Sequence, residues 1–307
     1  MSTNSSTRLG ATDLLMLLTC LFWALNFTVV KIAIRELAPH AFNASRLVIA
    51  SILLLAYLRI TEGGVSVSRS DLLKLTALGV VGNTFYQLLF INGLWRTTAS
   101  NTSLIMTITP IFIALLGSLS GVERIRWAGW TGIFVAFAGL YFVLFGLSGA
   151  PSLGSESQAG DLFVLGAAAC WSVYTVFSRP LLERMSPLKL TTLTFALGAL
   201  FYLPAAAGEI IATPWPSVSL GGWGALLYSA VFSFAIGYVF WYSSVKRVGT
   251  TKTGIFGYIT PVFAIIIARL FLGEEVHLSQ AAGVLVIFLG FYLTRFADRA
   301  NGRLGQV

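Results

Sequence analysis

Residues 75–95 read LTALGVVGNTFYQLLFINGLW and contain no charged side chain. A helix that crosses the roughly 30 Å hydrocarbon core of a bilayer needs about 20 mostly apolar residues, so this run is long enough for one complete crossing. Its apolar residues follow one another without the strict alternation of an outer-membrane barrel strand. The run therefore predicts a transmembrane α-helix.

The whole chain is also strongly apolar. Charged residues make up 10% of its 307 positions and hydrophobic residues 56%, whereas soluble domains are about 25% charged. So few charges cannot cover the surface of a soluble protein of this size. The net charge of +8 is spread between apolar runs instead of forming a basic patch, so nucleic acid is not an expected partner. Membrane lipid is.

Ten apolar segments are long enough to be membrane spans. The first is too long for the apolar part of a cleaved signal peptide, and no A-x-A-like site follows it, so we expect a retained span. The predicted spans are 11–31, 41–59, 72–94, 98–119, 127–146, 161–179, 188–207, 222–245, 251–272 and 279–296.

The positions of Lys and Arg predict the orientation, because basic residues near span ends gather on the cytoplasmic side. With ten spans both termini share one side, and most basic residues fall there; the opposite side holds Lys31, Arg35 and Arg96, with Arg46 and Arg269 inside spans. The residues on the shared side are Arg8, Arg59, Arg69, Lys74, Arg124, Arg126, Arg179, Arg184, Lys189, Lys246, Arg247, Lys252, Arg295, Arg299 and Arg303. Both termini are predicted to be cytoplasmic.

The chain also matches itself when it is shifted by about 150 residues. The matches keep one order along the chain, although each alone is weak. They are Trp23 with Trp171, Lys31 with Arg179 and Pro39 with Pro187 at a shift of 148, and Thr109-Pro110 with Thr260-Pro261, Arg96 with Arg247, Glu123 with Glu274, Gly139 with Gly290 and Tyr141 with Tyr292 at 151.

A repeat unit of five spans has a topological consequence. Because five is odd, the second copy must enter the membrane from the opposite face, which makes the copies inverted. We therefore predict an all-α membrane protein of ten transmembrane helices in two inverted five-helix repeats, 11–146 and 161–296. The segment 147–160 (LSGAPSLGSESQAG) is predicted to be the linker.

These features resemble the drug/metabolite transporter superfamily, in particular its ten-span EamA family of bacterial inner-membrane carriers. The resemblance covers about 11–296 and is carried by the mid-span tryptophans, by Pro39 and Pro187, by the Thr-Pro pairs and by the turns GVE (121–123) and GEE (273–275). It implies export of amino acids, neutral or aromatic, or of related small metabolites through a central cavity. Uptake carriers, and carriers of nucleotide-like compounds or cationic drugs, share the fold and stay as alternatives.

Two repeat-equivalent tryptophans lie in mid-span, although tryptophan usually lies at the membrane interface. Asn26 follows Trp23, and Tyr174 follows Trp171, at a spacing of three residues. This spacing places each pair on one helix face. We expect these pairs to line a cavity; hydrogen bonding that locks helix packing is the alternative.

Polar and aromatic residues also form stripes in the third and eighth spans, where polar groups should face a cavity or another helix instead of lipid. The third span carries Asn83, Tyr86 and Gln87 followed by Phe90, and the eighth carries Phe234, Tyr238, Trp241 and Tyr242. Asn101 in the fourth span and Tyr258 in the ninth complete the candidate substrate-binding set. Such a wall suits a zwitterion with an apolar or aromatic side chain.

Two mid-span prolines, Pro110 and Pro261, are predicted hinges. Each removes a helix hydrogen bond and so leaves a carbonyl, that of Met106 or Gly257, without its usual donor. Such carbonyls either bind substrate or are satisfied by neighbouring groups.

Charged residues within the spans are few. We expect Arg46 and Arg269 to extend to the outer surface and Lys252 to act as a cytoplasmic anchor, with substrate binding as its alternative role. No Asp or Glu lies in mid-span, so a carboxylate proton relay is not predicted. The two histidines, His40 and His277, lie at span ends. Neither an enzyme, a metal site nor a cofactor is therefore expected, and a channel remains a less favoured class.

The orientation predicts the behaviour of reporter fusions. Alkaline phosphatase fused to either terminus should be inactive, because that enzyme matures only outside the cytoplasm, whereas phosphatase inserted within 147–155 should be active. Green fluorescent protein at the termini should give the reverse pattern. Phosphatase activity at one terminus would contradict the even number of spans.

Overall fold

The computed structural model describes residues 11–121, 127–145, 156–275 and 278–302. These residues form ten helical spans and, within the described ranges, no strand. The first five spans are α1 (Ala11–Ala33), α2 (Pro39–Glu62), α3–η1–α4 (Arg69–Gly79, Val80–Phe85, Tyr86–Arg96), α5–η2–α6 (Ala99–Ile105, Met106–Ile108, Thr109–Leu119) and α7 (Trp127–Phe145).

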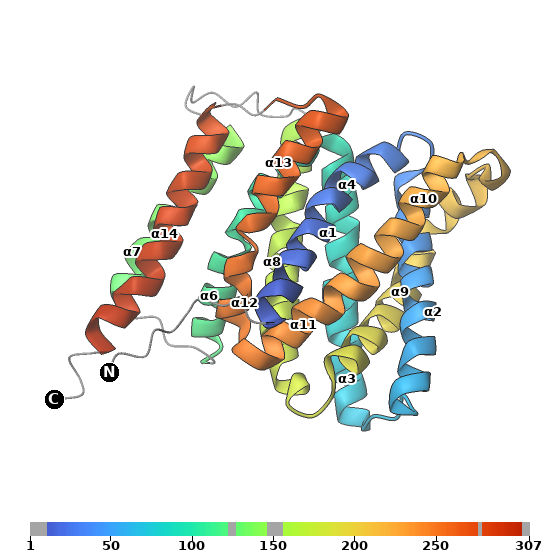
Figure 1. The fold of residues 1–307 in the computed structure, drawn as a ribbon, viewed down its shortest axis with the longest axis horizontal. Coiled ribbons are helices and arrows are strands. Elements are labelled where there is room, and N and C mark those ends of the chain that lie inside the picture. Colours follow the sequence, from blue (N-terminus) through green and yellow to red (C-terminus); the bar gives the residue numbers. More distant parts are fainter. Residues whose placement is uncertain (1–10, 122–126, 146–155, 276–277, 303–307) are drawn as a thin grey trace.

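The other five spans follow the same order of continuous and interrupted helices. They are α8 (Glu156–Leu182), α9 (Pro187–Ala212), α10–η4–α11 (Leu220–Tyr228, Ser229–Ile236, Gly237–Val248), α12–α13 (Thr250–Phe256, Ile259–Leu272) and α14 (Leu278–Gly302); the 3-10 turn η3 (Trp215–Ser217) precedes α10. The ten predicted spans are confirmed as helices. Figure 1 shows them as one bundle, with α7 and α14 side by side at one edge.

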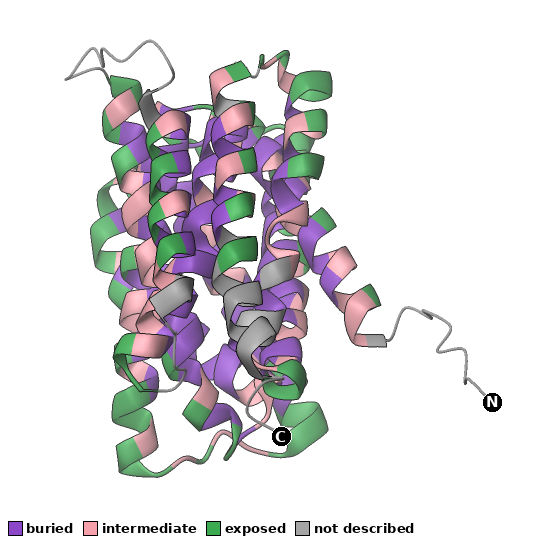
Figure 2. Ribbon diagram, turned by 90° about the vertical axis from the view of Figure 1, so that its left-hand side faces the viewer, coloured by how far each residue is buried: buried purple, intermediate pink, exposed green. Residues whose placement is uncertain are grey.

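Seven of the described helical segments are long and apolar enough to cross a membrane, and three shorter apolar helices, within α7, α13 and α14, complete the ten. Their surfaces agree with a lipid environment. Figure 2 shows buried residues concentrated inside the bundle, while large apolar side chains such as Leu73, Leu200 and Leu270 are mostly exposed. An apolar exterior of this extent faces lipid instead of water.

Polar residues set the ends of several helices. Ser68, Thr98, Ser186 and Ser219 each accept a hydrogen bond from the backbone N–H three residues on, and so cap α3, α5, α9 and α10. Such caps satisfy backbone donors that have no partner within the helix. One boundary differs from the expected one: α8 already begins at Glu156, inside the predicted linker, where an acidic first turn favours the helix dipole. The rest of that linker and Glu123 lie outside the described residues.

The irregular helices occur at equivalent places in the two halves. The third and eighth spans both contain a π-helical stretch, η1 and η4. The fourth span passes through the 3-10 turn η2 just before Pro110, and the ninth breaks at a turn between Phe256 and Ile259 just before Pro261. These interruptions follow the offset of 151 residues found in the sequence.

Repeat-equivalent helices pack against each other in antiparallel pairs. Glu209, near the end of α9, accepts hydrogen bonds from the first backbone N–H groups of α2 (2.6 Å from His40 N). At the other end Ser186, the cap of α9, donates to Glu62 at the end of α2 (2.9 Å). Each helix of this pair thus begins where the other ends, so α2 and α9 run antiparallel.

Glycine permits the closest of these contacts, between α7 and α14. A Cβ on Gly139 would lie 2.6 Å from both the carbonyl oxygen of Gly283 and the backbone nitrogen of Ile287. The antiparallel direction is evident here too, because Val143 of α7 also lies against Gly283 while Ala136 lies against Gly290. Small residues allow such backbone approach between membrane helices.

Gly139→Ala is therefore expected to lower the apparent Tm of the purified protein, because the added methyl group meets backbone that cannot move aside; overpacking costs about 1–3 kcal/mol. Gly208→Ala is the matched control, since a Cβ there meets nothing within 4 Å and alanine favours a helix. Equal Tm values for the two variants would contradict this packing.

Candidate functional site

A central cavity lies between the two halves of the bundle. About 740 Å³ of space in this region, including its part open to solvent, is not filled by protein atoms. Seven spans contribute to its lining. The residues are Trp23, Asn26, Phe27, Arg46, Tyr86, Gln87, Phe90, Ser103, Met106, Thr109, Pro110, Trp171, Ser233, Phe234, Tyr238, Trp241, Gly254, Gly257, Thr260 and Pro261.

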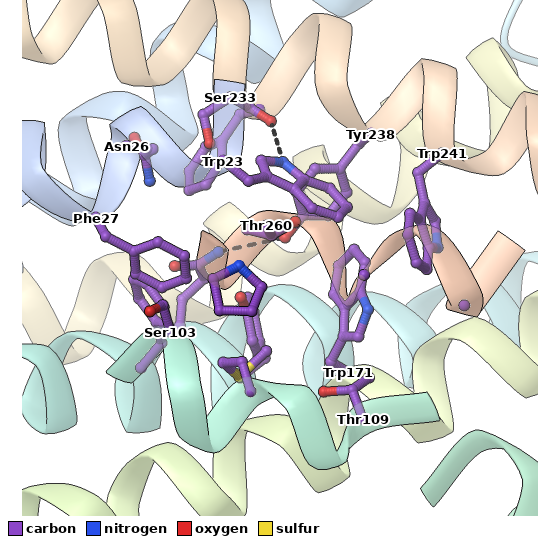
Figure 3. Close-up of a pocket in the computed structure, with 18 of the residues that line it drawn as sticks. Trp23, Asn26, Phe27, Ser103, Thr109, Trp171, Ser233, Tyr238, Trp241 and Thr260 are labelled. Carbon is purple, nitrogen blue, oxygen red and sulfur yellow. Dashed lines mark hydrogen bonds between the residues drawn. The ribbon is translucent and has the colours of Figure 1, made fainter. Parts of the chain in front are cut away.

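Four aromatic rings form one wall of this cavity. Trp23 and Trp171 lie edge to face with ring centroids 5.4 Å apart, and Trp241 lies 5.1 Å from Trp23 and 5.7 Å from Trp171. Tyr238 packs 5.0 Å from Trp171. Edge-to-face rings present both π faces and positive ring edges. Figure 3 shows the two indoles converging from α1 and α8, a contact that the sequence did not predict.

A second group of rings extends the wall along α4. Tyr86 lies 5.5 Å from Trp171 and 5.6 Å from Phe90, and Phe90 lies 5.8 Å from Phe27 of α1. The lining is thus mostly apolar and aromatic, which is typical of sites for small organic molecules.

The Trp23 indole is fixed across the interface between the halves. Its Nε1–H donates to the carbonyl oxygen of Ser233 in η4 (3.0 Å; Figure 3). The indole lies against Gly237, where a Cβ would come within 2.9 Å of Trp23 Nε1. The π-helical stretch and the glycine together therefore give this side chain its position.

The amide side chains join the same two halves. Ser229 donates to Asn26 Oδ1 (2.6 Å), and Gln87 Nε2 donates to the hydroxyl of Tyr238 (3.5 Å). Gln87 and Tyr238 are equivalent positions at the offset of 151. Asn26 and Gln87 thus line the cavity and also link helices, so the two roles considered from the sequence coexist.

The expectation that Arg46 extends to the outer surface is wrong. Its side chain is fully buried and lines the cavity. Its Nε donates to Asn43 Oδ1 (2.8 Å), its Nη2 donates to Gln87 Oε1 (3.2 Å), and its guanidinium carbon lies 4.3 Å from the centroid of the Phe234 ring. Arg46 lies near the start of the predicted span 41–59, and α2 begins only two residues earlier, at Pro39. The expectation failed because the side chain is held inward by Asn43, Gln87 and Phe234 instead of extending along the helix to the membrane surface. Arg269, in contrast, is exposed at the end of α13.

The two interrupted spans meet at the cavity. Pro110 of the fourth span lies beside Gly254 and Gly257 of the ninth. A Cβ on either glycine would be in van der Waals contact with the proline ring. Both predicted hinge prolines line the cavity. Interrupted helices at this depth expose backbone groups only where protein or a cavity covers them, and transporter sites commonly use them.

Four candidate residues lie away from the cavity. Asn83 is buried against Gly198 within η1, and the Tyr174 hydroxyl contacts Thr194 Oγ1 (2.5 Å) behind the aromatic wall. Asn101 donates to Asp161 and to Thr97 Oγ1 near the start of α5. Tyr258 packs against Phe288 at 4.7 Å. For Asn83 the cause is η1, because a π turn has more residues than the α spacing assumed for the stripe.

Several lining residues carry no strong signal in the sequence. Phe27, Ser233 and Gly254 are ordinary residues of apolar spans, and the sequence does not single them out. Met106 and Gly257 also line the cavity, and the Thr-Pro pairs had indicated them through their carbonyl groups. The side chain of Lys252 lies outside the described residues. Within the described residues, no group of three or more His, Cys, Asp or Glu side chains is placed to hold a metal ion.

Ten apolar helices around a central cavity lined by aromatic and polar residues are the architecture of a multi-pass membrane transporter. Comparison of the sequence with known families agrees. The chain belongs to the EamA-like transporter family, whose profile matches residues 10–145 and again residues 158–296.

Relatives align along nearly the whole chain. An uncharacterized transporter of Archaeoglobus fulgidus is 31% identical over 92% of this chain and 96% of its own length, and the uncharacterized transporter YyaM of Bacillus subtilis is 28% identical over 88% of each chain. A probable terminal-alkyne amino-acid exporter of Streptantibioticus cattleyicolor is 27% identical over 84% of each. One crystal structure aligns with a TM-score of 0.69 at 20% identity, over 94% of this chain and 100% of the other, which shows the fold alone.

The cavity predicts a difference between neighbouring residues in cysteine labelling. In a background without Cys20 and Cys170, Met106→Cys should react with a small water-soluble maleimide, because Met106 lines the cavity. Ile105→Cys should stay unlabelled, since Ile105 is fully buried in the packed cluster behind the cavity. Equal labelling of both positions in the folded protein would contradict a water-filled cavity at this place.

Proposed function

We propose that this transporter exports amino acids with neutral, apolar or aromatic side chains, or related small metabolites, by alternating access. The observation that carries the proposal is the aromatic and amide-lined cavity between the halves. Ring faces accommodate an apolar side chain and attract an ammonium group, and amide and hydroxyl groups bind the polar ends of a zwitterion. The probable amino-acid exporter among the relatives supports the same substrate class.

Alternating access is supported by the architecture. The two halves, 11–146 and 161–296, are proposed to be inverted repeats that rock against each other around the cavity. Antiparallel packing of α2 with α9 and of α7 with α14 supports this relation. Pro110 and Pro261 stand at the interruptions of the two spans that meet at the cavity, where a hinge bends the path of a helix without exposing backbone to lipid.

The lining disfavours one alternative substrate class. A carrier of cationic drugs benefits from a carboxylate in its cavity, whereas the charged residue in the described lining is the cation Arg46. An intramembrane enzyme would need acid and base groups beside a reacting atom, and the family is one of transporters. Uptake, with the same site working in the reverse direction, is the remaining alternative for direction.

The membrane and the orientation complete the proposal. The carrier is placed in the bacterial cytoplasmic membrane, with both termini in the cytoplasm, on the distribution of basic residues. Its relatives include transporters from bacteria. It needs no cofactor, because alternating access uses the solute gradient or a coupled ion instead of a chemical step.

Transport by reconstituted protein tests this function. Proteoliposomes containing the wild type should move labelled neutral amino acids down a gradient, with saturation and counter-flow. Trp171→Ala should reduce the initial rate at least about tenfold, because it removes the ring that contacts Trp23, Tyr86, Tyr238 and Trp241.

Trp223→Ala is the matched control, since Trp223 is exposed near the start of α10 and packs at a tilt against Trp215, away from the cavity. It should transport at the wild-type rate, and both variants should elute as monodisperse protein. Absence of flux for all twenty amino acids in the wild type would refute the substrate class, and non-saturating flux would favour a channel.

A further inference from the structure

Arg46 is a fully buried cation within a membrane span. No Asp or Glu of the described residues forms an ion pair with it. A charged side chain at such a depth is costly, and proteins retain one only where it pairs with other groups or carries a function. The groups around this guanidinium therefore show which of its N–H donors still lack an acceptor.

The protein supplies hydrogen-bond acceptors to only some of the N–H groups of this guanidinium. Asn43 and Gln87 accept from Nε and Nη2, and the Phe234 and Phe42 rings lie 4.3 and 5.4 Å from its central carbon. These contacts fix the plane of the group and lower the cost of burying it. Nη1 has no hydrogen-bond partner. Arginine carries five N–H donors, and the unused ones belong to a residue that lines the cavity.

Other buried polar atoms of the lining are also without partners. Trp241 Nε1 and Thr109 Oγ1 are buried and make no hydrogen bond. A buried donor without an acceptor destabilises the protein, so a solute that supplies acceptors here removes that destabilisation on binding. The cavity is thus rich in unused donors and contains a positive charge.

We propose that Arg46 Nη1 binds the carboxylate of the transported solute, with Gln87 as the positioning residue that holds the guanidinium. This assignment rests on the proposed function and narrows its substrate class to carboxylates. One carboxylate neutralises the one buried guanidinium, whereas a phosphate brings a second negative charge that no other cation in the described lining balances. The aromatic wall then receives the rest of the solute.

Matched acid and amide ligands test this inference on the wild-type protein without any substitution. The probes are L-phenylalanine, L-tryptophan and L-leucine with their carboxamides, and 3-phenylpropionate, which lacks the amino group. Binding is measured as the ligand-dependent rise in apparent Tm of purified protein. The acids should bind at least about tenfold more tightly than the amides, as expected for a hydrogen bond to a charged group. Equal binding by acids and amides, or no binding by any carboxylate, would overturn the inference.

Variants then assign the effect to Arg46. Arg46→Gln should raise KM for a transported acid about 10- to 100-fold, and Arg46→Lys should recover part of the loss because it retains the charge. Arg269→Gln, at the exposed end of α13, should transport as the wild type does. If Arg46→Gln folds and retains the wild-type KM, Arg46 is not the carboxylate ligand.

The outcomes separate this inference from the proposed function. Saturable amino-acid transport with an unchanged KM in Arg46→Gln would leave the function standing and refute the role of Arg46. Arg46-dependent binding of 3-phenylpropionate, with no binding or transport of any amino acid, would refute the amino-acid proposal while supporting the carboxylate site.

Discussion

Backbone hydrogen bonding in lipid is the constraint on which this structure depends. A peptide group in the hydrocarbon core has no water to bind, so every span must be helical, and an interruption is tolerated only where protein or a cavity covers it. The interruptions before Pro110 and Pro261 lie together at the central cavity. The need to satisfy backbone hydrogen bonds therefore makes the spans helical and confines their interruptions to the central cavity.

The packing of the halves follows from a second requirement, that helices without a hydrophobic drive to associate must fit closely. Gly139, Gly283 and Gly290 bring α7 and α14 into backbone contact, and these two helices form an edge pair outside the cavity lining. The cavity is instead built from the remaining spans except α9, which packs behind the wall through Thr194 and Gly198. Scaffold and binding surface are therefore assigned to different helices.

The cavity combines apolar walls with one charge. Its rings are held in edge-to-face and tilted contacts, and the Trp23 indole is hydrogen-bonded across the halves, so the wall is ordered before any solute binds. Arg46 differs, since its guanidinium is held in place yet only partly hydrogen-bonded. Preorganised walls and an unsatisfied polar group are the combination in which a ligand contributes the final contact.

The sequence by itself determined that the chain is an all-helical membrane protein of ten spans. It also predicted that Trp23, Trp171, Gln87 and Tyr238 line a cavity, as they do, and it singled out Pro110 and Pro261, which lie there too. The length of the apolar runs and the repeated motifs predict these features, because lipid requires each crossing segment to be apolar and helical along its own length. Only the tertiary structure decided the rest. It placed Arg46 inside the cavity, because the direction of that side chain depends on partners from other helices, Gln87 and Phe234. It also turned Asn83 away from Tyr86, because the π-helical η1 alters the rotation between them, a change that no α-helical spacing rule anticipates.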